Sequence, residues 1–462
     1  MDDAAPTRKL ETPDALTDVK GVRELRELVR LSWPITIAQL GMIAMSLVDT
    51  AILGHVSIDD LAGASIGRSI GFAAVTITMG VATGLEPLAS QALGAGDPGR
   101  AWNGLLANMR ACLYLWLPSV LVSFAVTLAL APLGIEATVI DRARGYLLGQ
   151  APQMGLIGIF LANKVFLQAH GVTRPALWGS AVANVVNIVV CNVLVRGDDA
   201  LVQVHLPPLG LPHLGALGAG LALSVATLVL ALFVVVPARA RKPKALAPPI
   251  PTRLVWKLGM PVGMHMLAEY AVFTLVALLA GKLGARVVSA HQIAIALASF
   301  MYMGALGVGG ATAVRVGLAV GSERSPRRAG LLGIALGAAF MSIGVVLFAV
   351  FPTYLIDLFT DDPDTIALGA QLLRIAALFQ LFDGVQVVAA GALRGAGDVR
   401  FPFIANVTAY WVLGLPVALL LCFGFDMGAR GLWWGLTLGL VFAAVTLGGR
   451  FVVLTRKRIA RV

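Results

Sequence analysis

Two acidic residues, Glu269 and Asp383, lie in the middle of long apolar stretches of the sequence. An ionisable side chain costs roughly 2.5 to 3.5 kcal/mol at the centre of a bilayer, so its presence there needs a reason. On a helix, Glu269 shares a face with His265, one turn earlier. Asp383 shares a face with Phe379 and Gln386, and His265, Phe379 and Gln386 are candidate substrate contacts. Carboxyl groups that meet away from water can exchange a proton or bind a cation, so we expect Glu269 and Asp383 to approach each other around a proton or a cation. The alternative is that each acid is packed and hydrogen-bonded to a neighbouring helix.

A second set of polar residues lies in the first half of the chain. Asp49 stands late in its apolar stretch, and Asn184 and Asn187 stand within another. We expect these residues to complete a first-half polar site, although the commoner role of an intramembrane Asn is an interhelical hydrogen bond. Glu86 lies near the inner end of its stretch, which favours a role as a gate.

The composition requires elements that cross a membrane. Hydrophobic residues make up 58% of the 462 residues and charged residues only 13%. The apolar stretches approach the roughly 20 residues that a helix needs to span a bilayer, and they lack the alternation of an outer-membrane barrel. The net charge of +10 comes from clusters between these stretches, so it reports topology rather than nucleic-acid binding. We expect no cleavable signal peptide, and the three cysteines lie within apolar stretches, where they predict neither a disulfide nor a metal site.

Breaks at charges, Pro and Gly predict twelve transmembrane helices. Most of the 35 lysines and arginines fall on the side that carries both termini, so the positive-inside rule predicts cytoplasmic ends in a multi-pass protein of the bacterial inner membrane. No nucleotide-binding, metalloprotease or hydrolase motif is present, which argues against an enzyme. The predicted helices are 31–53, 62–90, 105–132, 140–162, 176–195, 215–237, 258–281, 288–317, 330–356, 366–389, 402–424 and 431–454.

The sequence also repeats. Leu31, Pro34, Gly80, Gly94 and Arg100 align without a gap on Leu258, Pro261, Gly307, Gly321 and Arg327. Each half therefore has six helices, and an even number relates the halves by a pseudo-two-fold axis along the membrane normal. We expect an all-α polytopic fold of two six-helix bundles that rock around a central cavity, although duplication alone also suits a static channel. The predicted segments are a cytoplasmic N-terminal segment (1–30), the first bundle (31–237), a cytoplasmic linker (238–257), the second bundle (258–454) and a basic cytoplasmic tail (455–462).

Several short motifs together resemble those of the multidrug and toxic compound extrusion (MATE) transporters, most closely their NorM-like bacterial branch. The motifs are Trp33-Pro34, Val48-Asp49-Thr50, Gly54-His55, Gly84-Leu85-Glu86-Pro87-Leu88-Ala89-Ser90-Gln91, Pro261 with Glu269, Ala290-His291-Gln292-Ile293, Phe382-Asp383 with Gln386, Leu393-Arg394-Gly395, and Tyr410-Trp411 with Gly414-Leu415-Pro416.

The resemblance implies a V-shaped transporter that exports organic cations and dyes in exchange for Na⁺ or H⁺. It also implies that Glu269, Asp383 and Asp49 occupy the family's acidic cation-binding positions. Some relatives carry a Tyr where this chain has Phe379, and others carry an Asp where it has Cys191, so the coupling ion stays open. The expected partners are small cationic amphipathic substrates and membrane lipids. We expect a monomer, with no cofactor besides the coupling ion and no nucleic-acid partner.

A lipid-linked oligosaccharide flippase of related architecture is the alternative function. Such a protein needs a basic cavity for the pyrophosphate of its substrate. The mid-span ionisable residues here are mostly acidic, and the exceptions, Arg68 and Arg374, lie toward the outer ends, so the pattern favours cationic substrates.

Overall fold

The computed structural model describes residues 21–203, 205, 207–245 and 247–462, and nearly all of them are helical. Long runs of Leu, Val, Ile and Ala between breaks favour helices because every backbone polar group is then satisfied within the span. The helices are α2 (Gly21–Gly54), α3 (Ile58–Thr83), α4 (Leu85–Gly94), α5 (Pro98–Leu128), α6 (Ala137–Ala169), α7 (Arg174–Arg196), α8 (Asp198–Gln203), α9 (Gly215–Arg239), α10 (Thr252–Lys282), α11 (Ala285–Gly321), α12 (Arg327–Val350), α13 (Pro352–Asp357), α14 (Pro363–Gly395), α15 (Arg400–Val407), η1 (Thr408–Gly414), α16 (Leu415–Leu419), η2 (Leu420–Gly424) and α17 (Ala429–Leu454).

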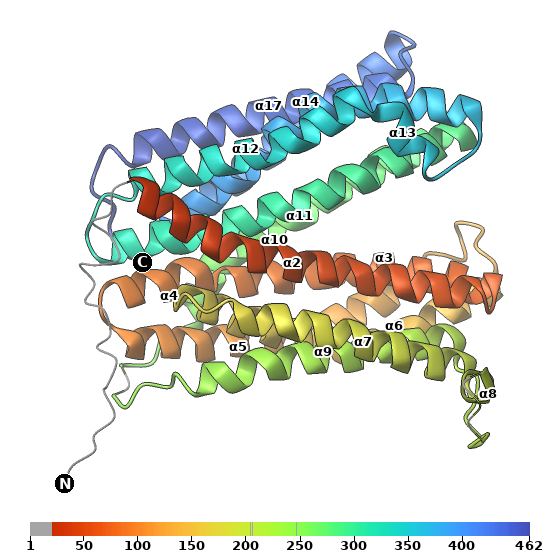
Figure 1. The fold of residues 1–462 in the computed structure, drawn as a ribbon, viewed down its shortest axis with the longest axis horizontal. Helices are drawn as coiled ribbons and strands as arrows, with labels where there is room; N and C mark the ends of the chain where they lie inside the picture. Colours follow the sequence, from red (N-terminus) through yellow and green to blue (C-terminus); the bar gives the residue numbers. More distant parts are fainter. Residues whose placement is uncertain (1–20, 204, 206, 246) are drawn as a thin grey trace.

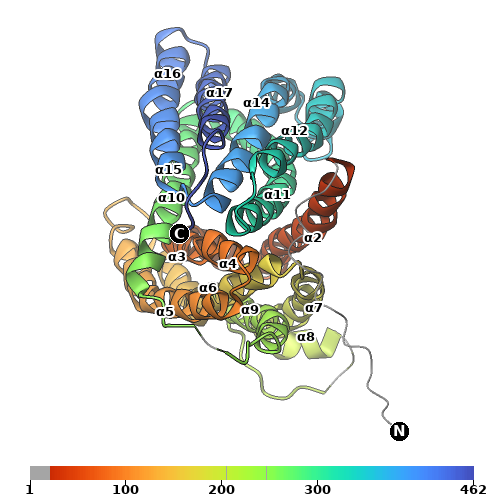
Figure 2. The ribbon, with the colours of Figure 1, turned by 90° about the vertical axis from the view of Figure 1, so that its left-hand side faces the viewer.

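The helices form two groups that follow the two halves of the chain (Figure 1). In the first group α6 is central and packs against α3, α5 and α9, whereas in the second group α14 is central and packs against α11, α12 and α17. Two helices also cross to the other half, because α2 packs against α11 and α10 packs against α3. Figure 2 shows α2 and α10 on opposite flanks of the contact between the groups.

Close contacts between the two groups repeat across a pseudo-two-fold axis. A methyl group on Gly94 of α4 would lie 2.3 Å from the carbonyl oxygen of Leu318 in α11. A methyl group on Gly321 of α11 would lie 2.1 Å from the carbonyl oxygen of Gln91 in α4. Gly321 and Leu318 are the repeat counterparts of Gly94 and Gln91, so the same contact is made twice with the halves exchanged. This reciprocity confirms the predicted fold class.

Eleven of the described helical segments are long and apolar enough to cross a bilayer. The twelfth predicted span, 140–162, lies within α6, which has 33 residues but carries more polar side chains than the others. Most of the second half of α6 is buried, and Gln150, Asn163, Lys164 and Gln168 are among its buried residues. A polar helix is tolerated there because its neighbours α3, α5 and α9 surround it.

Several helix boundaries differ from the prediction. The first helix begins at Gly21 rather than at residue 31, so residues 21–30 of the predicted N-terminal segment are helical, and residues 1–20 lie outside the described residues. The predicted helix 62–90 is divided at Gly84 into α3 and α4, and α4 continues to Gly94. The predicted helix 330–356 ends at Val350 and is followed by the separate α13.

The predicted helix 402–424 is not a uniform α-helix. Its segments η1 and η2 are π-helical, a local widening that often accompanies function. Tyr410 lies inside η1, where the widened turn changes the direction in which the following side chains project.

The connection between the halves is shorter than the predicted linker. Within 238–257, α9 extends to Arg239 and α10 begins at Thr252. The side-chain amide of Asn103 in α5 donates to the carbonyl oxygen of Pro248 at 3.1 Å. The connection is therefore held against α5 of the first group.

Candidate functional site

Glu269 of α10 and Asp383 of α14 interact electrostatically inside the second group. The Tyr410 hydroxyl donates to Glu269 Oε1 across 3.5 Å, and His265 Nε2 lies 3.6 Å from Glu269 Oε2. Asp383 is 5% exposed, and within the described part of the chain its carboxylate has no hydrogen-bond or ion-pair partner. Neither acid faces a Lys or Arg in an ion pair among the described residues, so the pair retains negative charge that a cation or proton can neutralise.

An aromatic cluster packs beside this pair of acids. Phe379 is 3% exposed, and its ring centroid lies 6.2 Å from Phe273 and 5.7 Å from Trp433. Phe273 in turn lies 6.0 Å from Tyr410, the residue that donates to Glu269. Phe379, which the sequence suggested as a substrate contact, is thus packed between α10, α14 and α17. Its direct neighbours are other rings, which hold the backbone one turn from Asp383.

Gln386 continues the polar face of α14 toward the inner end. Its side-chain nitrogen donates to Asn406 Oδ1 at 2.8 Å, while its own Oε1 has no hydrogen-bond partner among the described residues. Asn406 lies on α15, one turn before Tyr410. The face of α14 that carries Asp383 and Gln386 is therefore connected to the segment that carries Tyr410.

The polar residues predicted in the first half lie in two separate places. The side chains of Asn187 and Cys191 in α7 lie beside the Asp49 carboxylate, which is 1% exposed. Within the described residues, Asp49 Oδ1 and both polar side-chain atoms of Asn187 lack a partner of good hydrogen-bond geometry. Asn184 is apart from them, because its amide donates to the carbonyl oxygens of Gly41 and Ser180 at 2.9 and 2.8 Å. Asn184 thus joins α7 to α2, whereas Asp49 and Asn187 form a small buried polar cluster.

Ion pairs with little solvent exposure join the two groups at the end where α4 packs against α11 and α14. Glu86 of α4 accepts from Arg394 Nε of α14 at 3.0 Å, and Glu24 of α2 accepts from Arg315 Nε of α11 at 2.8 Å. Lys164 of α6 also interacts electrostatically with Glu86. Each pair contains one residue from each half, so the two halves are tied together at this end.

Comparison with known proteins identifies the family. The MatE family profile matches the chain twice, over residues 34–193 and 261–420. The chain belongs to the MatE family. It is 34% identical to the multidrug resistance protein NorM of Burkholderia vietnamiensis, over 100% of this chain and 99% of that protein. It is also 34% identical to a probable multidrug resistance protein NorM of Deinococcus radiodurans, over 94% of this chain and 96% of that protein.

The fold is likewise that of solved MATE transporters. The crystal structure of the eukaryotic MATE transporter AtDTX14 has a TM-score of 0.82 and 22% sequence identity, and it matches over 94% of this chain and 96% of that chain. This MatE protein is therefore a multi-pass membrane transporter of the NorM-like branch and not an enzyme.

Several residues of this MatE protein take part in the site or in the ion pairs between the halves but had no role predicted from the sequence. Tyr302 of α11 lies near both Glu269 and Asp383, although nothing in its spacing pointed to them. Tyr410 belongs to a motif that indicated the family but carried no predicted role. Lys164 and Arg315 were counted only as topology signals, and the missed signal is that each falls within or at the edge of an apolar span.

The ligand chemistry of the acidic pair suits small hard cations. The available donors are the two carboxylates and the Tyr410 hydroxyl, which are oxygen ligands. Among the described residues, no group of three or more His, Cys, Asp or Glu side chains is arranged to hold a metal ion.

Proposed function

We propose that this chain is a secondary antiporter that exports organic cations and dyes in exchange for H⁺ or Na⁺. The observation that carries the proposal is the pair formed by the partly buried Glu269 and the buried Asp383, whose charge no Lys or Arg among the described residues neutralises. The names of the NorM relatives, which are multidrug resistance proteins, support drug export.

Coupling follows from competition for the same carboxylates. A cationic substrate and a coupling ion both gain from the negative charge of Glu269 and Asp383, so binding of one weakens binding of the other. An ion shifts the conformational equilibrium only if its affinity differs between the two states. One positive charge that moves inward across about 100 mV releases roughly 2.3 kcal/mol. A gradient of one pH unit adds about 1.36 kcal/mol, so both terms are available to drive export of a neutral substrate with one ion per cycle. Exchange of one ion for one monovalent organic cation moves no net charge, so only the concentration gradient of the ion drives it.

Alternating access requires an end that opens and closes. The ion pairs Glu24–Arg315 and Glu86–Arg394 tie the halves at the end near the last residue, whereas the two groups diverge toward the opposite end (Figure 1). With that tied end cytoplasmic, as the distribution of Lys and Arg predicts, the arrangement corresponds to a state closed on the inside. Opening to the cytoplasm then requires both pairs to separate, which makes Glu86 part of the inner gate. We propose that this cycle runs in a monomer in the bacterial inner membrane.

Export from proteoliposomes tests the function. The protein is reconstituted with a fluorescent cation inside, and an inward Na⁺ or H⁺ gradient is imposed. We expect wild type to export the dye under one gradient, while Glu269→Gln and Asp383→Asn lose at least about 90% of that rate. Glu136→Gln removes an exposed carboxylate before α6 and serves as the matched control, with near wild-type export expected.

Each alternative gives a different result in the same system. Dye movement that continues at large currents without either gradient indicates a channel. Absence of dye export under both gradients, combined with movement of a lipid-linked oligosaccharide, indicates a flippase. Both results contradict the proposed antiport.

A further inference from the structure

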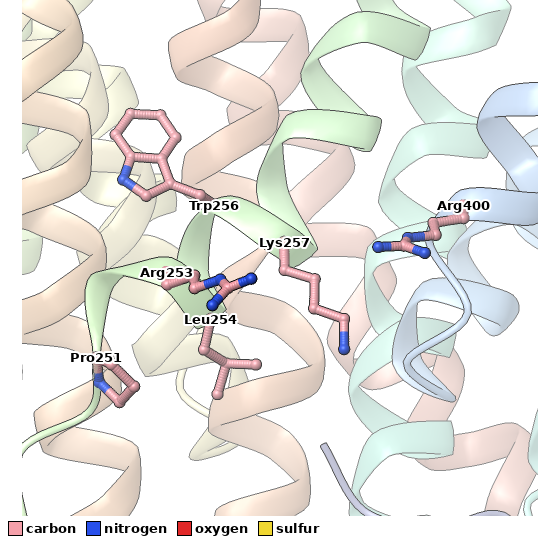
Figure 3. A pocket seen from close by; sticks show the side chains of 6 residues that line it. All are labelled: Pro251, Arg253, Leu254, Trp256, Lys257 and Arg400. Atoms are coloured by element: carbon pink, nitrogen blue, oxygen red, sulfur yellow. The ribbon is translucent and has the colours of Figure 1, made fainter.

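A basic cavity lies outside the proposed transport site, at the inner end of the contact between α10 and α15. It has a volume of about 750 Å³ and is lined by Pro251, Arg253, Leu254, Trp256, Lys257 and Arg400. Figure 3 shows Arg253 and Lys257 at the start of α10 and Arg400 at the start of α15, with their charged ends directed toward the space between the two helices. The cavity therefore brings three cationic side chains to one place.

These three cations are not neutralised by the protein. Within the described residues, Arg253, Lys257 and Arg400 have no acidic partner. Asp398, two residues before Arg400, is engaged elsewhere, since it accepts from Arg450 at 2.9 Å. A concentration of uncompensated positive charge around a cavity indicates an anionic ligand.

The surface beyond the cavity is apolar. Leu254 and Trp256 belong to the lining itself. Two helical turns beyond Lys257 on the same face of α10 lies Met264, which is 40% exposed. One turn beyond Arg400 on α15 lies Ile404, which is 60% exposed. Each helix thus carries cations at its inner end, followed by an exposed apolar side chain. A phospholipid has the matching order, with its phosphate headgroup beside the cations and its acyl chains beside the apolar side chains.

We propose that this cavity binds the phosphate headgroup of an anionic phospholipid, with the acyl chains lying along α10 and α15. A basic pocket between membrane helices at the cytoplasmic level is suited to such headgroups. The apolar continuation distinguishes a lipid from a soluble anion, because inorganic phosphate gains nothing from Met264 or Ile404. The bound lipid contacts both α10 and α15 and stabilises their packing. Glu269 lies on α10, and α15 is followed directly by the segment that contains Tyr410.

Lipid binding to the purified full chain in detergent tests the proposal. The probes are phosphatidylglycerol, phosphatidylcholine with the same acyl chains, and inorganic phosphate, with affinity measured by thermal shift. The triple variant Arg253→Gln, Lys257→Gln and Arg400→Gln should bind phosphatidylglycerol about 100-fold more weakly, from the contribution of each cation near a membrane surface. The control variant Arg239→Gln, Arg456→Gln and Lys457→Gln removes three exposed cations elsewhere at the inner end and should stay within about twofold of wild type.

Other outcomes overturn the proposal. If both triple variants bind phosphatidylglycerol equally weakly, its affinity depends only on the net charge of the protein. Equal stabilisation by inorganic phosphate and phosphatidylglycerol means that the ligand is a soluble anion.

A second measurement needs only a mild substitution. Phosphatidylglycerol with brominated acyl chains should quench Trp256 fluorescence, and the quenched component should be missing in Trp256→Phe. Quenching that is identical in wild type and Trp256→Phe places the lipid elsewhere and overturns the site.

Discussion

Gly80 of α3 and Gly263 of α10 face each other so closely that a methyl group on Gly80 would lie 2.1 Å from the Cα atom of Gly263. The counterpart pair in the repeat is Gly307 of α11 and Thr36 of α2, and a methyl group on Gly307 would lie 2.1 Å from the Thr36 hydroxyl oxygen. Small residues let membrane helices approach to backbone contact. The two halves are therefore joined by two related contacts, one on each flank.

Alanine substitutions should separate this role of glycine from helix propensity. Alanine normally stabilises a helix by about 1 kcal/mol relative to glycine. We expect Gly80→Ala to lower the melting temperature in detergent, because the added methyl group meets the backbone of α10. In Gly310→Ala on α11, the added methyl group would meet nothing within 4 Å, so the melting temperature should stay unchanged or rise. Equal melting temperatures for both variants would contradict the close approach.

The Glu86–Arg394 pair should contribute strongly to stability because both side chains are largely buried. Arg394→Gln leaves the Glu86 carboxylate with Lys164 as its nearby cation, so we expect a loss of about 3 kcal/mol, the lower end of the range for breaking a buried pair. The double variant Glu86→Gln with Arg394→Gln should recover part of this loss.

Thermal unfolding of the four proteins in this double-mutant cycle measures the coupling directly. Arg450→Gln, which breaks a more exposed pair with Asp398 within the second half, is the matched control and should cost less. Additive effects of the two substitutions would show that Glu86 and Arg394 do not stabilise each other.

Asp362 lies outside the membrane-spanning part of α14. It should make the stability of the first turn of this helix depend on pH. Hydrogen bonds from the Thr365 hydroxyl and backbone N–H hold the pKa of the Asp362 carboxyl below its usual range. A carboxyl group whose pKa is lowered by folding stabilises the fold above its unfolded-state pKa, and this contribution disappears as the pH falls through the lowered value. Hydrogen exchange, corrected for the intrinsic rate, should therefore show less protection of this turn at about pH 3 than at about pH 6.

Two variants check that the effect belongs to the cap. Asp362→Ala should show weak protection at both pH values, whereas Asp364→Asn should behave like wild type. Protection that falls with pH to the same extent in Asp362→Ala would assign the effect to another group.

The twelve-helix fold was predictable because each span is a continuous run of mostly apolar residues. The repeat was predictable because residues such as Pro34 and Pro261 align without a gap. The start of α2 at Gly21 was not, because those residues carry charges that indicate a cytoplasmic segment but do not prevent a helix. The break at Gly84 and the π-helical η1 depend on packing between helices, which local patterns do not record.

The candidate site was predictable to a similar extent. Glu269 and Asp383 stood out because a mid-span acid is costly, and the structure places them near enough for their charges to influence each other. The Glu24–Arg315 pair was missed because its members are far apart in the chain and each looks like an ordinary charge at a helix end. Sequence periodicity assigns a residue to a face of its own helix, but which other helix meets that face is decided by tertiary packing.

The central claim is that substrate and coupling ion compete for Glu269 and Asp383. The most direct measurement is the affinity of the purified protein for a fluorescent organic cation as Na⁺ concentration and pH are varied. We predict that wild type binds the cation more weakly as one of the two ions is added, and that Glu269→Gln and Asp383→Asn lose this dependence while Glu136→Gln keeps it. An affinity that is independent of both ions in wild type, or a dependence that survives in both variants, would contradict the account.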